Sequence, residues 1–390
     1  MSESAEFELP TQEHFRGDLR ALCLGAIRLT LEMLLDEEVR TLVGAGRWQR
    51  LVGRKDVRNG SYLRRLVTSM GLVELEVPRA REGGSAGEVL GRYKRRTVQI
   101  DDAITAAYVH GVSTRKMGEV TEALMGERVG RSTVSRVTRS LEERVEALRS
   151  ERIEEEVPYL YLDATFLDAR WARTVENVAA LVAYGVGPDG HRKLLGITIG
   201  AQESEASWSE LLGQLVDRGL NGVRLVIADA HGGLAAAARK HLPEAAQQRC
   251  TVHLERNVLS KTPQRLRGRM ASEVSRIFDA PSASEAKARL EQLKLGLGKQ
   301  LPEAMACLIA GFAAATQFYA FPKAHWRRIR STNGLERLHG EIKRRIRVVG
   351  AFPDRASALR LITAVALHVT SIWGDRRYLD LSKEITRKVA

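Results

Sequence analysis

Residues 159–200 decide the fold, because they hold three strand-like runs with no helical pattern between them: YLYLDATF (159–166), VAALVAYGV (178–186) and KLLGITIG (193–200). Short polar turns separate the runs, and the triplet PDG at 188–190 is a typical turn sequence. Consecutive strands joined by short turns, without a crossover helix, pair antiparallel. The stretch therefore predicts an antiparallel meander of three strands.

The chain after the meander alternates between helices and strands. SEASWSELLGQLVDRGL (204–220) has the period of an amphipathic helix, VRLVIADA (223–230) is a buried type of strand, GGLAAAARKHL (232–242) is helical, and QRCTVHL (248–254) is a short strand. The order of three strands, helix, strand, helix, strand matches the ribonuclease-H-like fold, a five-stranded sheet with helices on both sides. The expected fold class is therefore mixed α/β.

Further regions flank or interrupt this core. Helical spacing at 15–44 precedes the alternating strand VELEVPR (73–79), and three consecutive helical patterns follow within 101–149. We expect an N-terminal DNA-binding region over 1–95, a helix-turn-helix domain over 96–150, a catalytic domain over 155–254 and 326–375, and an α-helical insertion over 255–325.

The helices expected in 96–150 form a helix-turn-helix pattern. The last one, GRSTVSRVTRSLEERVEAL (130–148), opens with Ser, Thr and Arg, where a recognition helix meets base edges and phosphates. A plain helical bundle with a solvated basic face has the same spacing, so this pattern alone leaves both interpretations open. The candidate DNA contacts are Arg131, Ser132, Thr133, Ser135, Arg136 and Arg139.

The overall charge suits a polyanionic partner. The chain has 61 Lys and Arg against 48 Asp and Glu, a formal net charge of +13, although a merely soluble basic protein shows such a surplus too. Its three cysteines lie far apart and predict no disulfide framework. The polar N-terminus and the absence of a long apolar run predict a cytoplasmic protein with no membrane span, associated with the nucleoid when it binds DNA.

Two carboxylates end central strands. Asp163 lies among aromatic and aliphatic residues, where a carboxylate is costly to desolvate without compensating charge, and Asp229 repeats this at the end of VRLVIAD. Ligands in α/β sheets gather at strand ends, and hard oxygen donors suit Mg²⁺ or Mn²⁺. A single Asp there is more often a cap or turn residue. The pair in this strand order predicts a divalent-cation site.

A third carboxylate is needed to hold two ions about 4 Å apart for displacement at phosphorus. The basic helix STNGLERLHGEIKRRIRVV (331–349) offers Glu336 and Glu341, on opposite flanks of an apolar stripe. Helix geometry does not choose between the two glutamates, and a surface ion pair is a further interpretation of either. The stripe consists of Leu335, Leu338, Ile342 and Ile346.

The same helix lies in a strongly basic run. Nine Lys or Arg and only two acids occur from Lys323 to Arg347, which predicts contacts with DNA phosphates. Glu336 shares its flank with Lys343 and Arg347, which could hold a phosphate beside a metal site. The candidate phosphate-binding residues are Arg327, Arg328, Arg330, Lys343, Arg344 and Arg347.

Cys250 and His253 form a C-x-x-H pair. One such pair supplies two zinc ligands, and no second pair stands at zinc-finger spacing. A structural role, or the positioning of a DNA strand, is therefore favoured over a zinc site.

Taken in order, several segments resemble the mutator-type transposases of bacterial insertion sequences, members of the DDE transposase group. The resemblance runs from about residue 55 to 375. Its segments are RNGSYLRR, LEVPRAR, HGVSTRKM, YLYLDATF, LLGITIGAQESEASWSELLGQLVDRGL, VIADAHGGL, QRCTVHLERNV and HWRRIRSTNGLERLHGEIKRRIRVVGAFP.

The resemblance implies catalytic and metal-binding roles for three acids. The family's first acid, in a strand written roughly LDA, falls on Asp163, and its second, in DGH or DGL, falls on Asp229. Its glutamate, in TNxxER, falls on Glu336 and so decides against Glu341. The family's C-x-x-H signature falls on the pair described above, and Trp326 stands where such proteins have a tryptophan near the end of the insertion. Ala230 departs from the family's usual glycine.

By resemblance, the chain is a DNA transposase with two Mg²⁺ ions per site, for which Mn²⁺ can substitute. It binds the terminal inverted repeats of its element, frees a 3′-OH with metal-activated water, and joins that 3′-OH to another phosphodiester. The implied partners are double-stranded repeat and target DNA and a second copy of the chain. The alternatives are an inactive or domesticated transposase that only binds DNA, and a ribonuclease-H-like nuclease.

Overall fold

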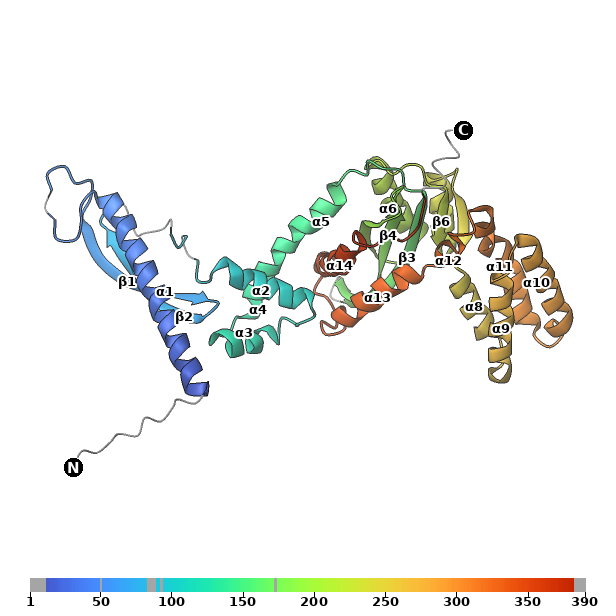
Figure 1. Cartoon of the computed structure of the whole chain (residues 1–390), viewed down its shortest axis with the longest axis horizontal. Helices are drawn as coiled ribbons and strands as arrows, with labels where there is room; N and C mark the ends of the chain where they lie inside the picture. Colours follow the sequence, from blue (N-terminus) through green and yellow to red (C-terminus); the bar gives the residue numbers. More distant parts are fainter. Residues whose placement is uncertain (1–11, 50, 83–88, 92–93, 172–173, 382–390) are drawn as a thin grey trace, which may run out of the picture. The chain divides into compact units, whose positions relative to one another are not determined.

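The computed structural model describes residues 12–49, 51–82, 89–91, 94–171 and 174–381 (Figure 1). The chain divides into two compact units, Met1–Arg139 and Ser140–Ala390. Each unit has hydrophobic clusters of its own, so each buries apolar surface within itself.

The first unit begins with a long helix on a β-hairpin. Helix α1 (Gln12–Val43) contacts strand β2 (Gly71–Ala80), which pairs antiparallel with β1 (Arg58–Thr68). Residues of β2 are alternately buried and accessible over most of the strand, as the VELEVPR pattern predicts. Leu35 and Val39 of the helix share a buried cluster with the hairpin.

Three short helices complete the first unit. α2 (Val98–Val109), α3 (Met117–Met125) and α4 (Arg131–Val137) bury a common apolar cluster. The single helix predicted over 130–148 is wrong, because the chain passes from α4 through a 3₁₀ turn, η1 (Thr138–Ser140), into α5 (Leu141–Ser150) of the second unit. The buried Thr138 hydroxyl donates to the carbonyls of Val134 and Ser135, a backbone competition that favours such a tightened turn.

A five-stranded mixed sheet organises the second unit, with the order β5-β4-β3-β6-β7. The predicted antiparallel meander is confirmed as β3 (Tyr159–Trp171), β4 (Thr174–Val186) and β5 (Arg192–Gly200). Strands β6 (Leu225–Ala228) and β7 (Ala246–Arg249) extend it in parallel. The strand predicted over 248–254 is wrong beyond Arg249, because β7 stops where its partner β6 stops and Cys250 caps α8 (Thr251–Ser260).

Three helices build the core around this sheet. α6 (Glu205–Asp217) and α7 (Gly232–His241) contact each other and share a buried cluster with the sheet that includes Trp208. α14 (Arg355–Thr370) contacts β3 and β5. The segment Arg355–Trp373 is long and apolar enough to cross a membrane by length and composition. Most of its apolar residues in α14 are buried in protein, which is the pattern of a core helix.

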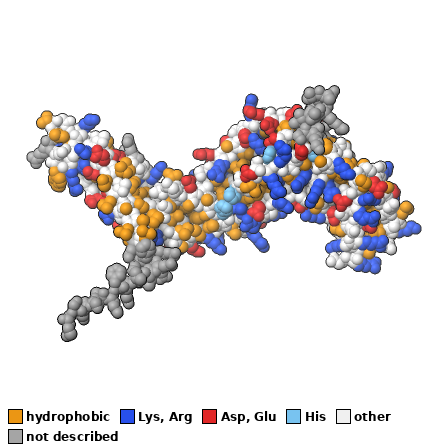
Figure 2. Space-filling view, viewed as in Figure 1, with side chains coloured by type: hydrophobic (Ala, Val, Ile, Leu, Met, Phe, Trp, Pro, Cys, Tyr) orange, Lys and Arg blue, Asp and Glu red, His pale blue; other side chains and the backbone are white. Residues whose placement is uncertain are grey.

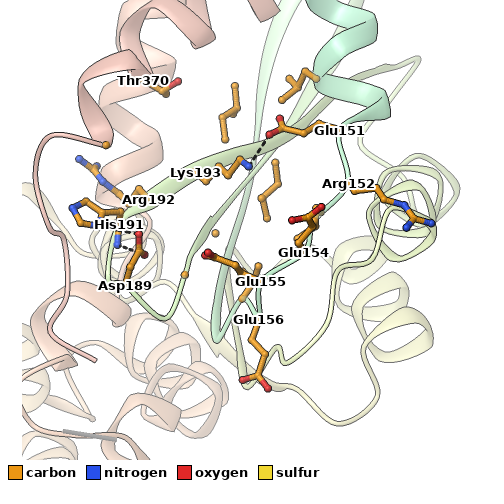
Figure 3. Close-up of a pocket in the computed structure, with 18 of the residues that line it drawn as sticks. Glu151, Arg152, Glu154, Glu155, Glu156, Asp189, His191, Arg192, Lys193 and Thr370 are labelled. Atoms are coloured by element: carbon orange, nitrogen blue, oxygen red, sulfur yellow. Dashed lines mark hydrogen bonds and ion pairs between the residues drawn. The ribbon is translucent and has the colours of Figure 1, made fainter. Parts of the chain in front are cut away.

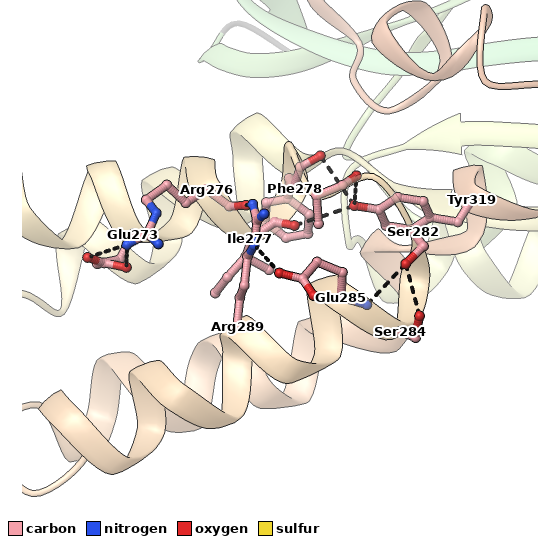
Figure 4. Close-up of polar contacts among 10 residues, drawn as sticks. Glu273, Arg276, Ile277, Phe278, Ser282, Ser284, Glu285, Arg289 and Tyr319 are labelled. Atoms are coloured by element: carbon pink, nitrogen blue, oxygen red, sulfur yellow. Dashed lines mark hydrogen bonds and ion pairs between the residues drawn. The ribbon is translucent and has the colours of Figure 1, made fainter.

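A helical region separates β7 from the basic helix of the sequence, as predicted. It contains α8, α9 (Arg267–Phe278), α10 (Ala283–Leu297) and α11 (Pro302–Ala315). Arg289 of α10 donates to the carbonyl of Arg276 of α9 at 2.6 Å and so links the two helices (Figure 4). Arg276 also pairs with Glu273 within α9 at 3.1 Å, and Arg289 pairs with Glu285 within α10 at 3.0 Å. The chain then forms α12 (Trp326–Ile329) and α13 (Asn333–Ile346), and α13 contacts β3.

Candidate active site

The pairing of β3 with β6 sets Asp163 beside Asp229. Residues 159–161 pair in parallel with residues 225–227, and the same register carried two residues further places Asp163 opposite Asp229. Neighbouring strands lie about 4.8 Å apart, so the two carboxylates start from adjacent backbone positions. Each Oδ1 accepts a hydrogen bond from the amide of the following residue, at 3.0 Å for Asp163 and 2.6 Å for Asp229.

Helix α13 carries the two glutamates that helix geometry left open. The Oε1 of Glu336 lies 2.6 Å from Nη1 of Arg256 and 3.7 Å from Nε2 of His253, both on α8. Glu341 pairs instead along its own helix, 2.6 Å from Nη2 of Arg344. Of the two glutamates, Glu336 therefore contacts α8, the helix that follows β7. The apolar stripe predicted for α13 is buried: Leu335, Leu338, Ile342 and Ile346.

A buried histidine joins α13 to the first acid. His339 Nδ1 lies 3.4 Å from Asp163 Oδ2, and the two side chains are 8% and 12% exposed. His339 stands three residues after Glu336, so one helical turn connects the third acid to the first. The sequence alone gives His339 no role, since only the folded chain brings it to Asp163.

The C-x-x-H pair links the end of β7 to the start of α13. The buried Cys250 thiol accepts hydrogen bonds from the amide and the hydroxyl of Thr332, both at 3.4 Å. Burial raises the pKa of this thiol, but hydrogen bonds with His253 and Thr332 outweigh burial and lower it. The hydrogen bond with Cys250 raises the pKa of His253 to about 9, against the effect of burial, and the charges of Asp229 and Asp163 add to the rise. His253 is thus a cation beside Glu336.

A fourth carboxylate, Glu203, lies between β5 and α6 and was missed from the sequence. Its Oε1 accepts a hydrogen bond from Trp208 Nε1 at 3.3 Å and lies 3.8 Å from Nδ1 of His231. Burial raises the pKa of Glu203, His231 opposes the rise, and the charges of Asp163 and Asp229 add to it. Glu203 therefore shares the electrostatic field of both acids. In sequence it looks like an ordinary acid just before a helix.

The donor chemistry of the three acids fits the cofactor that the sequence predicts. Carboxylate oxygens are the ligands that Mg²⁺ and Mn²⁺ prefer. Within the described ranges, no three His, Cys, Asp or Glu side chains stand close enough together to hold an ion. The carboxylate of Glu336 is occupied by its ion pair with Arg256 of α8. Metal binding therefore requires Glu336 to exchange this partner, and it stays a prediction.

The predicted recognition-helix residues lie on α4 and η1 of the first unit. Five of the six side chains are accessible for DNA contact, which itself stays a prediction. Arg131, Ser132, Ser135, Arg136 and Arg139 are exposed, and Thr133 is half-buried.

Two of the basic residues predicted to bind DNA near α13 already have acidic partners. Arg330 pairs with Asp279, and Arg344 pairs with Glu341, each at 2.6 Å. The other four have no acidic partner in the part of the chain that the structure describes, and they line two separate hollows: Lys343 and Arg347 beside Phe166 of β3, and Arg327 and Arg328 beside the start of α13.

Trp326, whose role the sequence left open, has a structural role. Its Nε1 donates to the carbonyl of Phe321 at 2.7 Å. Its ring packs edge-on against Tyr319 and Phe318, with centroid separations of 4.7 and 5.8 Å. These contacts fix the chain where the helical region returns to α12.

A cavity of about 720 Å³ beside β4 and β5 holds none of the three acids (Figure 3). Part of its charged lining is paired within the cavity, Lys193 with Glu151 at 2.7 Å and His191 with Asp189 at 3.0 Å. It contributes no residue to the candidate active site.

Known proteins are similar to this chain over nearly its whole length. The sequence profile described as "Transposase, Mutator family" matches residues 7–375. The chain is 36% identical over 359 residues to the transposase for insertion sequence element ISRM5 of Rhizobium meliloti, which covers 91% of this chain and 89% of that relative. It is 36% identical over 356 residues to the transposase for insertion sequence element IS256 in transposon Tn4001 of Staphylococcus aureus, covering 90% and 91%.

A third relative shows the same extent of similarity. The transposase for insertion sequence element IS1081 of Mycobacterium tuberculosis is 36% identical over 364 residues, covering 92% of this chain and 88% of the relative. Because the profile and the alignments span nearly the whole chain, the protein belongs to the Mutator family of transposases.

Proposed function

We propose that this transposase binds the terminal inverted repeats of an insertion sequence, cleaves a DNA strand to free a 3′-OH, and joins that 3′-OH to another phosphodiester. Its catalytic acids are Asp163, Asp229 and Glu336. The observation that carries the proposal is the parallel pairing of β3 with β6, whose register, extended by two residues, brings Asp163 level with Asp229. Family membership supports the reaction class, and the contact of α13 with the helix after β7 supports the third acid.

Each acid has a defined part in this proposal. The three carboxylates would hold two Mg²⁺ ions, with Mn²⁺ as the substitute, and such ions would supply activation of a water or hydroxyl nucleophile and stabilisation of the leaving oxygen. Glu336 gives up its ion pair with Arg256, and the freed guanidinium is then available to a phosphate oxygen. His339 holds the orientation of Asp163.

His253 supplies a positive charge beside the third acid. Its raised pKa, about 9, keeps it positively charged at neutral pH beside Glu336. A positive charge there offsets the repulsion among the clustered carboxylates while they have no counter-ion. Cys250 supports this role through its hydrogen bonds with His253 and with Thr332, the residue before α13.

The wider architecture fits the same function. The sheet order, with a three-stranded antiparallel part extended by two parallel strands, supports a ribonuclease-H-like catalytic core. The exposed basic residues of α4 support a helix-turn-helix that contacts DNA. Joining an element's two ends favours a homodimer, and genomic DNA as the substrate favours the cytoplasm and the nucleoid of a bacterial cell.

A strand-transfer assay tests the proposal against its two rivals. The unmodified protein is incubated with an oligonucleotide duplex that ends in the element's inverted repeat, with Mg²⁺, Mn²⁺ or EDTA. We expect joined products with either metal and none with EDTA. Binding without cleavage would favour an inactive, DNA-binding descendant. Cleavage of an RNA–DNA hybrid without joining of DNA ends would favour a ribonuclease-H-like nuclease.

A further inference from the structure

A cavity of about 600 Å³ lies where α12, the start of α13, α8 and residues 376–378 meet. We call it the arginine pocket, because its lining holds seven arginines and two acids. The arginines are Arg192, Arg327, Arg328, Arg330, Arg337, Arg376 and Arg377, and the acids are Glu255 and Asp279.

The two acids neutralise little of this charge. Asp279 pairs with Arg330 at 2.6 Å. Among the described residues of the lining, Glu255 is the one acid left to face the other six arginines, and burial raises the pKa of its carboxyl against the pull of Arg256. The remaining six arginines of the pocket have no acidic partner within the described ranges. A cluster of like charges without counter-charge is unfavourable unless a ligand supplies the anion.

Aromatic rings hold the guanidinium groups in place. The guanidinium groups of Arg192 and Arg328 lie over the ring of Tyr378, 4.5 and 4.8 Å from its centroid. The guanidinium of Arg192 also lies 4.3 Å from the ring centroid of Trp373. Burial lowers the pKa of Arg192, and the charge of Arg328 lowers it further. The Nε of Arg192 is buried without a hydrogen-bond partner among the described residues. Cation–π contacts thus keep two repelling cations together while their N–H donors stay available.

A glycine lets α13 begin against this cluster. A Cβ on Gly334 would lie 2.6 Å from Tyr184 Oη and 3.7 Å from Arg192 Nη1. Arg337 of the pocket follows Glu336 directly on the first turns of α13. A ligand in the pocket is therefore close to the third acid along the helix.

We propose that the arginine pocket binds backbone phosphates of the DNA strand that passes Glu336. A guanidinium group matches phosphate oxygens in geometry and charge. When it is stacked on an aromatic ring, it is already ordered for that contact. The polar, arginine-rich lining does not suit an apolar ligand. This inference rests on the proposed function, since a phosphodiester is the substrate of that reaction.

The test measures how salt weakens the affinity for an inverted-repeat duplex, by fluorescence anisotropy. Each lost phosphate contact lowers the slope of log affinity against log salt by about 1. We expect R337Q to lower it by about that amount and the double variant R192Q/R328Q to lower it further. R276Q is the control, because Arg276 of α9 is already paired with Glu273 (Figure 4). Wild-type slopes in both pocket variants would overturn the proposal.

A single variant and a phosphate titration distinguish a DNA-binding pocket from a site for small phosphates. Arg337 is exposed, so R337Q keeps the test valid if the double variant does not fold. Inorganic phosphate is titrated as a second probe. Variants that lose phosphate binding but keep the wild-type DNA slope would show a small-phosphate site and overturn the assignment to DNA. A wild-type protein that fails to cleave DNA, while the variants still lower the slope, would reject the proposed chemistry and retain the pocket.

The long helix of the first unit supports a second inference, which is independent of the arginine pocket. Helix α1 has two apolar stripes on opposite faces. One stripe packs on the hairpin through residues such as Leu31, Leu35 and Val39. The other is exposed, with 50% of Leu19, 70% of Leu22, 64% of Leu29 and 73% of Met33 accessible, and Ala26 lies between them. Figure 2 shows hydrophobic side chains gathered over the N-terminal half of this helix.

The exposed stripe has the spacing of a helix-pairing seam. Positions 19, 22, 26, 29 and 33 alternate steps of three and four residues, the a and d positions of a heptad repeat. Of the flanking residues, Cys23, Gly25 and Thr30 carry no charge, and Glu32 is held by Arg28 and by the amide of Glu76 on the hairpin. The core of an interface is depleted of charge. A heptad seam complements its own copy. We infer that α1 of a second copy of this chain covers the stripe, as a helix pair over about 21 Å.

Analytical ultracentrifugation of the full chain tests this pairing. We expect a concentration-dependent dimer in the unmodified protein and a monomer in L22K/L29K, whose substituted positions are exposed and leave the core of the unit intact. L63K, on β1 and 74% exposed, is the matched control and should behave as wild type. A monomeric wild type, or a charged variant that still dimerises, would contradict the inference. Mass is the readout, so the result does not depend on the proposed chemistry.

Discussion

Truncation of His339 to alanine tests whether α13 orients the first acid. His339 Nδ1 lies 3.4 Å from Asp163 Oδ2, and both side chains are largely buried. Groups that orient metal ligands contribute about 10- to 100-fold to metal affinity. H339A should therefore weaken Mn²⁺ binding by about 1.4–2.7 kcal/mol.

The assay is urea unfolding with and without Mn²⁺. At an ion concentration of one hundred times the wild-type Kd, binding stabilises the wild type by about 2.7 kcal/mol. The same concentration should stabilise H339A by only about 1.4 kcal/mol if affinity falls tenfold, and by about 0.4 kcal/mol if it falls a hundredfold. E341A, on the same helix, is the control and should retain the full gain, because Glu341 pairs with Arg344 rather than with the site. A folded H339A that gains as much stability from Mn²⁺ as the wild type would refute the role of His339.

Three further perturbations probe the surroundings of the acids. E203Q keeps an acceptor for Trp208 but removes a charge near both aspartates, so we expect cleavage to need about 10- to 100-fold more Mg²⁺, and an unchanged Mg²⁺ dependence would speak against Glu203. G334A places a Cβ 2.6 Å from Tyr184 Oη and should lower the free energy of unfolding by about 1–3 kcal/mol; equal urea midpoints would show that the helix start can shift freely. The pKa of His253 is raised from 6.5 to about 9, so its stabilisation of the metal-free protein is complete below pH about 6.5 and is lost as the pH rises through 9. The difference in unfolding free energy between wild type and H253Q should shrink over that interval, and a difference independent of pH would contradict the assignment.

The central sheet was predictable because its pattern is local. Each of the three predicted runs lies inside an observed strand: 159–166, 178–186 and 193–200. The short turns between them leave little choice of pairing. Asp163 and Asp229 were proposed from local context, as acids in or directly after apolar strands. The parallel pairing of β3 with β6 that brings their positions level depends on a register that no local pattern contains.

The features that the sequence missed depend on contacts between distant segments. Glu203 looks like a helix-start acid, and only folding brings it into the field of the two aspartates. Glu336 and Glu341 flank the apolar stripe of α13 on opposite sides, so helix geometry favours neither as the third acid. The contacts of Glu336 with α8 distinguish the two. The break after Val137 in the helix predicted over 130–148 follows from a buried threonine that bonds to its own backbone.

The most direct test of the central claim is the cleavage rate of an inverted-repeat duplex in Mg²⁺ by D163A, D229A, E336A and E341A. Asp163 lies in β3 and Asp229 directly follows its neighbour β6, Glu336 contacts α8, and Glu341 pairs on its own helix. Loss of cleavage in the first three variants, with DNA binding retained, and near-wild-type cleavage in E341A are the predicted results. Cleavage that persists in D163A, D229A or E336A, or that disappears in a folded E341A, would contradict the assignment of the three acids.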